Sequence, residues 1–172
     1  KININLMSMQ VSSGRNTLQF DNAAVYRLLK LRIVLETSWF LEDLHEDSDR
    51  WTPYRRWFDS LGSNDTIVTT NYDLIPEVLY ERRYGTEKIE WGSKINGPLL
   101  CKLHGSCNWT LSNGKLVKSA FVDLSDMISR DFLIGMPGIG KSKLATGVLA
   151  SEWTMAKEKI LGAEVISIVG YS

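Results

Sequence analysis

Strand-like segments alternate with helix-like segments over most of the chain, and this alternation limits the possible folds more than any other feature. The first clear strand is 66–70, where β-branched residues dominate, and a helix is predicted over 74–83. Strands at 99–104 and 164–169 have the same buried character. Such alternation predicts an α/β fold in layers, with a mainly parallel sheet and flanking helices.

Local signals predict the remaining elements. These are a helix from Asp21 or Asn22, a short helix from Pro53, a hairpin turning at Asn113-Gly114, a strand over 131–134 and a helix over 142–161. Apolar residues recur at helical spacing in the first helix, at Ala24, Leu28, Leu31 and Leu35. We expect this stripe to face the core. No element is predicted in the first twenty residues, which are polar and irregular.

The composition favours a soluble globular domain. The chain has 172 residues, of which 20 are Lys or Arg and 20 are Asp or Glu, so its formal net charge is 0. A neutral chain has no general electrostatic attraction for nucleic acids or membranes, and we expect neither as a direct partner. No apolar run reaches the ~18 residues of a membrane span. Because no signal peptide opens the sequence either, a cytoplasmic location is expected.

A single domain is expected over residues 1–172, with a mostly helical part at 1–62 and a sheet-bearing part at 63–172. The sequence starts at Lys1 and ends directly after a predicted strand. We therefore expect an internal piece of a longer protein, whose fold is incomplete at both ends.

Three predicted strands end in small or polar residues. The sequences at these ends are Thr-Thr-Asn-Tyr-Asp at 69–73, Leu-His-Gly-Ser at 103–106 and Gly-Tyr-Ser at 170–172. Ligands of open α/β sheets bind at the carboxyl ends of strands, so we expect these residues to line one crevice. Each also has a local explanation: Asn71 and Asp73 suit a turn and a helix cap, and a lone histidine is commonly a satisfied strand-end residue.

Together and in this order, the three motifs resemble those of the sirtuin-like NAD-hydrolase family of prokaryotic antiphage-defence proteins. Trp109 follows the histidine motif, as a tryptophan often does in that family, and the resemblance spans roughly residues 60–172. It implies a Rossmann-like fold and an NAD glycohydrolase that cleaves NAD to ADP-ribose and nicotinamide. It also implies an oligomeric parent protein, triggered by a sensor domain or an activating partner.

The resemblance further implies the roles of individual residues. His104 is expected to be the general base, since histidine titrates near neutral pH, and Asn71 is expected to orient water and ribose. Asp73 is expected either to hydrogen-bond locally or to contact the nicotinamide side. The other expected NAD-binding residues are Thr69, Thr70, Gly105, Gly170 and Ser172, of which the last two would approach the adenosine-side ribose or phosphates.

Two features of related proteins are missing from the sequence. The Gly-rich loop that holds the NAD diphosphate has no counterpart, because Ser13-Gly14-Arg15 does not match it. We expect this loop upstream of Lys1, and we expect the isolated chain to be inactive. The zinc module of the sirtuin deacetylases is also missing, and Cys101, His104 and Cys107 supply too few ligands for a zinc site. No metal is therefore expected.

Two other functions stay open. Residues 135–142, Gly-Met-Pro-Gly-Ile-Gly-Lys-Ser, satisfy the Walker A pattern of nucleoside-triphosphatases, and a helix is predicted to follow. The preceding strand is short, however, and no second strand ends in the aspartate expected for magnesium. The other alternative is a non-catalytic module that binds NAD or ADP-ribose. The presence of both Asn71 and His104 favours the enzyme, because a pure binder needs neither.

Overall fold

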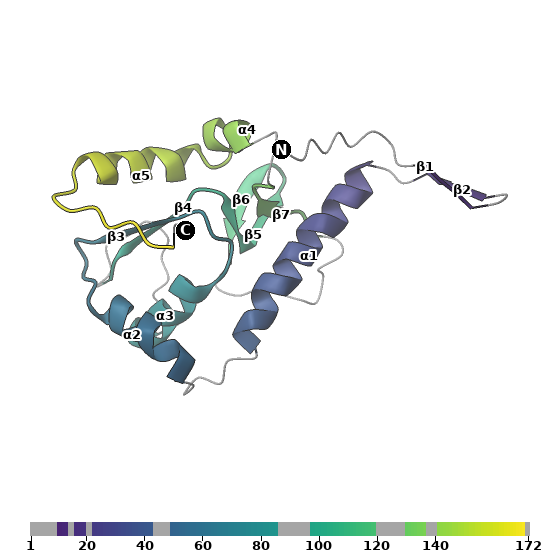
Figure 1. The fold of residues 1–172 in the computed structure, drawn as a ribbon. Coiled ribbons are helices and arrows are strands. Elements are labelled where there is room, and N and C mark those ends of the chain that lie inside the picture. Colours follow the sequence, from purple (N-terminus) through teal and green to yellow (C-terminus); the bar gives the residue numbers. More distant parts are fainter. Residues whose placement is uncertain are drawn as a thin grey trace.

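The computed structural model describes residues 10–13, 16–19, 22–42, 49–85, 97–119, 130–136 and 141–170. They form a mixed α/β structure (Figure 1). In chain order the elements are β1 (Gln10–Ser13), β2 (Asn16–Gln19), α1 (Asn22–Glu42), η1 (Asp49–Trp51), α2 (Thr52–Asp59), β3 (Thr66–Thr69), α3 (Ile75–Tyr84), β4 (Leu99–Lys102), β5 (Gly105–Ser112), β6 (Lys115–Lys118), β7 (Phe132–Ile134), α4 (Lys141–Thr146) and α5 (Ala150–Leu161).

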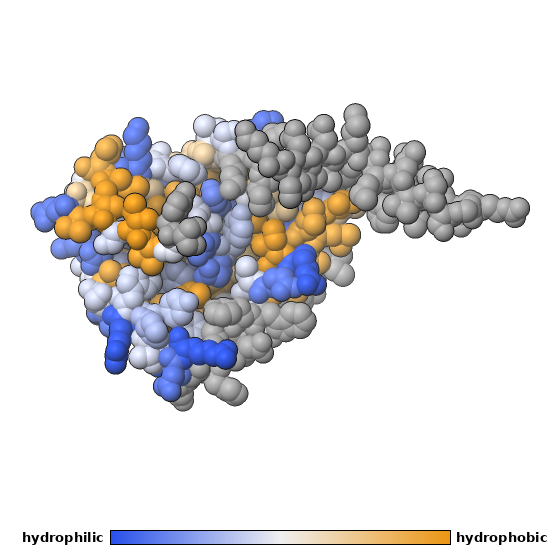
Figure 2. All heavy atoms as spheres, in the orientation of Figure 1, coloured by the Kyte–Doolittle hydropathy of each residue, from blue (hydrophilic) through white to orange (hydrophobic). Residues whose placement is uncertain are grey.

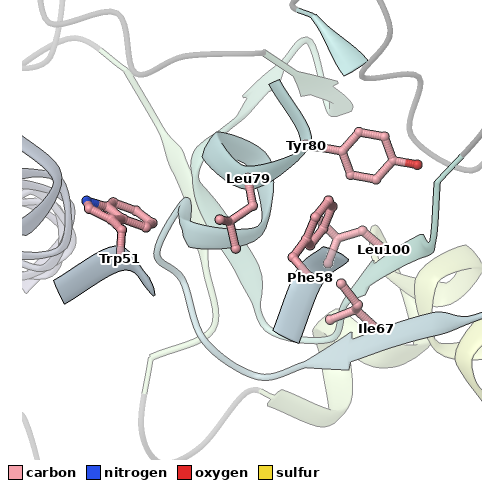
Figure 3. Close-up of a cluster of buried hydrophobic side chains, with 6 residues drawn as sticks. All are labelled: Trp51, Phe58, Ile67, Leu79, Tyr80 and Leu100. Atoms are coloured by element: carbon pink, nitrogen blue, oxygen red, sulfur yellow. The ribbon is translucent and has the colours of Figure 1, made fainter. Parts of the chain in front are cut away.

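The parallel unit predicted around residues 66–104 is confirmed. Strands β3 and β4 run parallel, with Thr66 opposite Leu99 and Thr69 opposite Lys102, and α3 lies between them in the chain. Buried side chains from η1, α2, α3 and both strands form a core beside this unit (Figure 3), made of Trp51, Phe58, Ile67, Leu79, Tyr80 and Leu100. This core holds α2 and α3 against the strand pair and so fixes the loops that follow each strand.

Strands β5, β6 and β7 form an antiparallel sheet in the order β6-β5-β7. Asn113 and Gly114 make the turn between β5 and β6 with φ values of 51° and 73°. A two-residue hairpin turn of type I′ requires positive φ at both positions, which Asn and Gly tolerate best. The hairpin predicted from the Asn-Gly pair is therefore confirmed.

The expectation of a mainly parallel sheet is wrong for the described residues. They contain one parallel pair, β3–β4, and the antiparallel pairs β1–β2, β5–β6 and β5–β7. β4 ends at Lys102 and β5 begins at Gly105, and β5 pairs with β6 and β7 in a separate sheet. A parallel neighbour needs a crossover of about a dozen residues or more, and this connection is far too short. The broader prediction, that the chain belongs to the α/β class, is confirmed.

The strand predicted over 164–169 is also not found. Residues 163–170 leave α5 as irregular chain, drawn in yellow in Figure 1. Val165, Ile168 and Val169 are 82%, 82% and 83% exposed, and Figure 2 shows apolar surface gathered over this segment. Its β-branched residues favour a strand, but a strand also needs a neighbour for its backbone groups. The described part of the chain pairs none with it.

Two predicted helices differ in detail. The helix predicted over 142–161 is divided into α4 and α5 by a turn at 147–149, where Gly147 is a poor helix former. In α1 the fully buried residue is Val34, whereas Leu28 and Leu35 of the predicted core stripe are 61% and 38% exposed. Leu31 of the predicted stripe does pack against the buried cluster that contains Val34. The buried face of the helix therefore overlaps only part of the predicted stripe.

The described N-terminal residues form a hairpin that the sequence did not predict. β1 and β2 pair antiparallel, from Gln10 opposite Gln19 to Ser13 opposite Asn16. Their polar composition hides the strand signal, because strands are recognised mainly by alternating apolar residues. Among the helices that the structure describes, none has the length and apolar character needed to cross a membrane.

We expect the chain to self-associate through residues 165–169. Exposed apolar side chains on an unpaired, β-prone segment are a site for pairing with another chain. Such surfaces associate at a protein concentration of ~100 µM. In analytical ultracentrifugation at this concentration, the wild type should form oligomers. The triple variant Val165→Ser, Ile168→Ser, Val169→Ser should sediment as a monomer. A monomeric wild type at this concentration would contradict the prediction.

Candidate functional site

The ends of β3 and β4 lie side by side because the strands are parallel neighbours. Thr69 is paired with Lys102, and the Leu103 amide donates a hydrogen bond to the Thr69 carbonyl oxygen at 2.9 Å. Asn71 and His104 each follow this last pair by two residues. The structure thus brings both predicted catalytic residues to the same carboxyl edge of the parallel pair, where ligands of α/β sheets bind.

The half-buried side chain of His104 has two aromatic rings near it. Its ring centroid is 6.5 Å from that of Tyr72 and 6.5 Å from that of Trp153. The Tyr72 hydroxyl donates to the carbonyl oxygen of Gly135 at 2.5 Å, and Trp153 Nε1 donates to the carbonyl oxygen of Leu103 at 2.9 Å. Both neighbouring rings are thus held by hydrogen bonds to the backbone on the side of His104.

Gly105 is required by the backbone directly after the histidine. Its φ is +84°, and a Cβ at this position would lie 1.9 Å from the carbonyl oxygen of Leu133. Strand β7 also contacts the turn through the Gly135 amide, which donates to the His104 carbonyl oxygen at 2.7 Å. Only glycine fits here without displacing β7. The role of Gly105 in NAD binding stays a prediction.

The polar groups around Asn71 stabilise the turn that presents it. The Asn71 side chain is exposed, and its backbone amide donates to Thr69 Oγ1 at 3.0 Å. Asp73 Oδ1 accepts a hydrogen bond from the Ile75 amide at 3.0 Å, an Asx turn that leads into α3. This hydrogen bond is the local role expected for Asp73. Contact with nicotinamide, like NAD binding by Thr69 and Thr70, stays a prediction.

A buried ion pair joins the last residue of β4 to the first turn of α3. Lys102 is 0% and Glu77 2% exposed, and Lys102 Nζ lies 2.6 Å from Glu77 Oε1. Burial raises the pKa of the Glu77 carboxyl, and the nearby charge of Lys102 opposes this rise. The ammonium also donates to the Asp73 carbonyl oxygen at 2.5 Å and to Ser106 Oγ at 2.8 Å. One buried cation thus contacts the loop between β3 and α3 and the start of β5, which directly follows the turn at His104.

The third predicted motif, at 170–172, is not presented by a strand. Gly170 has a φ of +77°, and a Cβ built there would meet no atom within 4 Å. Ser172 lies outside the described residues. The predicted contacts of these two residues with NAD stay predictions.

A cavity of about 290 Å³ lies between α1, β7 and α4. Its walls include the side chains of Tyr26, Lys30, Met136, Lys143 and Leu144. None of the predicted catalytic or NAD-binding residues lines this cavity. It is therefore separate from the edge that carries Asn71 and His104.

The described residues offer no metal centre, because no three of their His, Cys, Asp or Glu side chains cluster in a suitable way. Cys101 and Cys107 are fully buried and unpaired with each other. Burial raises the pKa of each thiol to about 11. A thiol with so high a pKa is a poor nucleophile at neutral pH, so neither cysteine is suited to covalent catalysis.

We expect both thiols to resist alkylation in the folded protein. At pH 8, a thiol with a pKa of about 11 is ionised in about one molecule in a thousand, and only the thiolate reacts. Modification by iodoacetamide should be at least ~10²-fold slower than in guanidinium chloride, where burial is lost. Mass spectrometry of the alkylated protein measures both rates. Rapid modification of Cys101 or Cys107 in native buffer would contradict the described burial.

The residues around the Walker A pattern differ from a phosphate loop in two respects. The preceding strand β7 spans Phe132–Ile134 and pairs antiparallel with β5, whereas a phosphate loop follows a strand of a parallel sheet. The following helix α4 ends at Thr146 after one and a half turns. Residues 137–140 lie outside the described residues. The described neighbours of this loop therefore favour the Asn71–His104 edge over a triphosphate site.

Sequence reasoning missed three residues that shape the edge. Tyr72 lies within the motif at 69–73 and Trp153 within the helix predicted over 142–161, but neither was expected to lie beside the histidine. Lys102 did carry one, since a single charged residue stands in the otherwise apolar run 99–103. A lysine in a buried strand must find oxygen partners, because an unpaired buried charge is costly.

Comparisons with models of protein families, with curated proteins and with solved structures find no match to this chain. Its function is therefore argued from its own residues and their geometry.

Proposed function

We propose that this chain is part of a sirtuin-like NAD glycohydrolase that acts in antiphage defence. The observation that carries the proposal is the position of Asn71 and His104 at one carboxyl edge of the parallel pair β3–β4. An amide and an imidazole at such an edge suit the cleavage of a ribosyl bond. The sequence motifs that contain them supply the family and the substrate.

The reaction that we propose breaks the bond between nicotinamide and the ribose C1′ of NAD. Its transition state resembles an oxocarbenium ion, as in glycoside cleavage. Water adds to C1′, nicotinamide leaves with the electron pair of the broken bond, and one proton is released. His104 takes this proton from the water or a ribose hydroxyl, and Asn71 orients water and ribose. The rings of Tyr72 and Trp153 lie near the imidazole.

Product analysis tests the proposal. The chain, and the longest native protein that contains it, are incubated with NAD, and nicotinamide and ADP-ribose are quantified by chromatography. Equal amounts of both products in the longer protein support NAD hydrolysis. NAD binding without products supports the non-catalytic module, and the absence of both overturns the proposal.

The variant Lys141→Ala separates this proposal from a Walker A nucleoside-triphosphatase. The lysine of a phosphate loop contacts the β- and γ-phosphates, so its loss abolishes binding of ATP with magnesium. Lys141 has no such role in NAD cleavage as we propose it. The rate of NAD cleavage by the Lys141→Ala variant of the longest native protein should therefore stay within ~3-fold of the wild-type rate, the range of an indirect effect. Binding of ATP and magnesium by wild type, lost in the variant, would favour the nucleoside-triphosphatase.

A further inference from the structure

We propose that Lys102 is a positioning residue, which holds two segments in one fixed arrangement. One is the loop between β3 and α3 that carries Asn71, and the other is 103–107, where the turn that carries His104 leads into β5. These two segments are the loops of the edge. This role rests on the proposed function, since it concerns the same edge. The mechanical part of the role, the ordering of two loops by one cation, is measurable without any catalysis.

The contacts of the Lys102 ammonium reach both loops at equivalent places. The Asp73 carbonyl oxygen, at 2.5 Å, lies two residues after Asn71. Ser106 Oγ, at 2.8 Å, lies two residues after His104. Lys102 therefore links the loops close to both predicted catalytic side chains.

The two loops also contact each other where the lysine joins them. The Cys107 amide donates to the Tyr72 carbonyl oxygen at 3.0 Å, and the Ser106 hydroxyl approaches the same oxygen at 3.4 Å. The third oxygen around Lys102 is Glu77 Oε1, from the first turn of α3. Helix α3 is anchored in the core through Leu79. The Lys102 ammonium thus links both segments to helix α3.

Stability alone does not require a lysine at this position. Burying two charges costs several kcal/mol, and an apolar pair of similar size is often equally or more stable. Within the described residues, Glu77 Oε2 is buried without a hydrogen-bond partner, so even the carboxylate is not fully compensated. An apolar side chain would fill the space. It would not donate hydrogen bonds to the two loops, and this is the property that we assign to Lys102.

The double variant Lys102→Met, Glu77→Leu tests the role, because it removes both charges and keeps an apolar core. Hydrogen exchange of the present chain is followed by mass spectrometry. We expect peptides covering 70–73 and 103–107 to exchange at least ~10-fold faster than in wild type, while peptides in β3 and α3 stay within ~2-fold. In the longest native protein we expect kcat to fall at least ~10-fold, with KM for NAD within ~3-fold, as for lost positioning.

Two further variants keep the test decisive. Ser106→Ala leaves the ion pair in place and removes one acceptor of Lys102, together with the 3.4 Å contact of the hydroxyl with the Tyr72 carbonyl oxygen. We expect faster exchange over 103–107 in this variant too, and it replaces the double variant as the test if the double variant does not fold. Arg83→Met is the matched control: Arg83 links α3 to the carbonyl oxygens of Phe58 and Leu61, at the other end of the helix. It should leave exchange at 70–73 and 103–107, and kcat, unchanged.

Unchanged loop exchange in a folded double variant, or in Ser106→Ala, overturns the positioning role. Faster loop exchange in the present chain, combined with no nicotinamide release from NAD by the longest native protein, supports the mechanical role of Lys102 and refutes the proposed function. The two failures are therefore distinguishable. If Arg83→Met lowers kcat as much as the double variant does, the fall in kcat reflects general stability, and the positioning role of Lys102 is overturned.

Discussion

His104→Ala and Asn71→Ala should each lower the rate of NAD cleavage by at least ~10²-fold, the usual scale for a lost general base or positioned group. In the proposed reaction the imidazole accepts the proton of the attacking water, so its loss removes that acceptor. Without the Asn71 amide, water and ribose lose their common hydrogen-bonding partner. The measurement is nicotinamide release by the longest native protein that contains the chain.

Two matched variants control for general effects of the substitutions. The chain holds one other histidine, His45, and Asn64 is an exposed loop residue outside the edge. His45→Ala and Asn64→Ala should leave nicotinamide release unchanged. Thermal unfolding of all four variants shows whether each retains the fold. Turnover near the wild-type rate in a folded His104→Ala or Asn71→Ala protein would refute the role assigned to that residue.

Gly105→Val should destabilise the protein by at least about 3 kcal/mol, the range of severe backbone strain combined with a clash. A Cβ at Gly105 would lie 1.9 Å from the Leu133 carbonyl oxygen, and φ is +84°. The clash involves backbone on both sides, so no change of rotamer relieves it. Strand β7 must separate from the turn that follows β4, and the hydrogen bond between the Gly135 amide and the His104 carbonyl oxygen is lost.

Gly114→Val separates the clash from the strain. Gly114 has a similar φ of +73°, but a Cβ there would meet no atom within 4 Å. Strain alone should cost about 1–2 kcal/mol for a residue in the left-handed region. Urea unfolding measures both variants. Equal losses at Gly105 and Gly114 would show that the close approach of Leu133 does not control stability.

The sequence predicted best those elements whose signals are local. The type I′ turn at Asn113-Gly114 follows from the two residues themselves, since both tolerate positive φ. The parallel pairing of 66–69 with 99–102 follows from two buried strands joined by a helical crossover. From this pairing alone, Asn71 and His104 could be placed at one edge.

Features that depend on distant parts of the chain were beyond sequence reasoning. Residues 164–169 have the composition of a strand, but pairing is decided by whether a neighbour lies beside them. The chain also reverses at 103–104 because Gly105 can adopt positive φ and accept β7 at close range. Nothing in the alternation of strands and helices indicates that reversal. The contacts of Tyr72 and Trp153 with His104 likewise join residues far apart in sequence.

Hydrogen exchange in the presence of NAD most directly tests the claim that NAD binds at the edge of Asn71 and His104. Mass spectrometry resolves this edge from the Walker A region, and saturating NAD is compared with saturating ATP and magnesium. We expect NAD to slow exchange over 69–77 and 103–108 in the longest native protein. We expect ATP with magnesium to slow exchange neither there nor in the Walker A region. Protection of 135–146 by either nucleotide, with no change over 69–77 and 103–108, would contradict the claim.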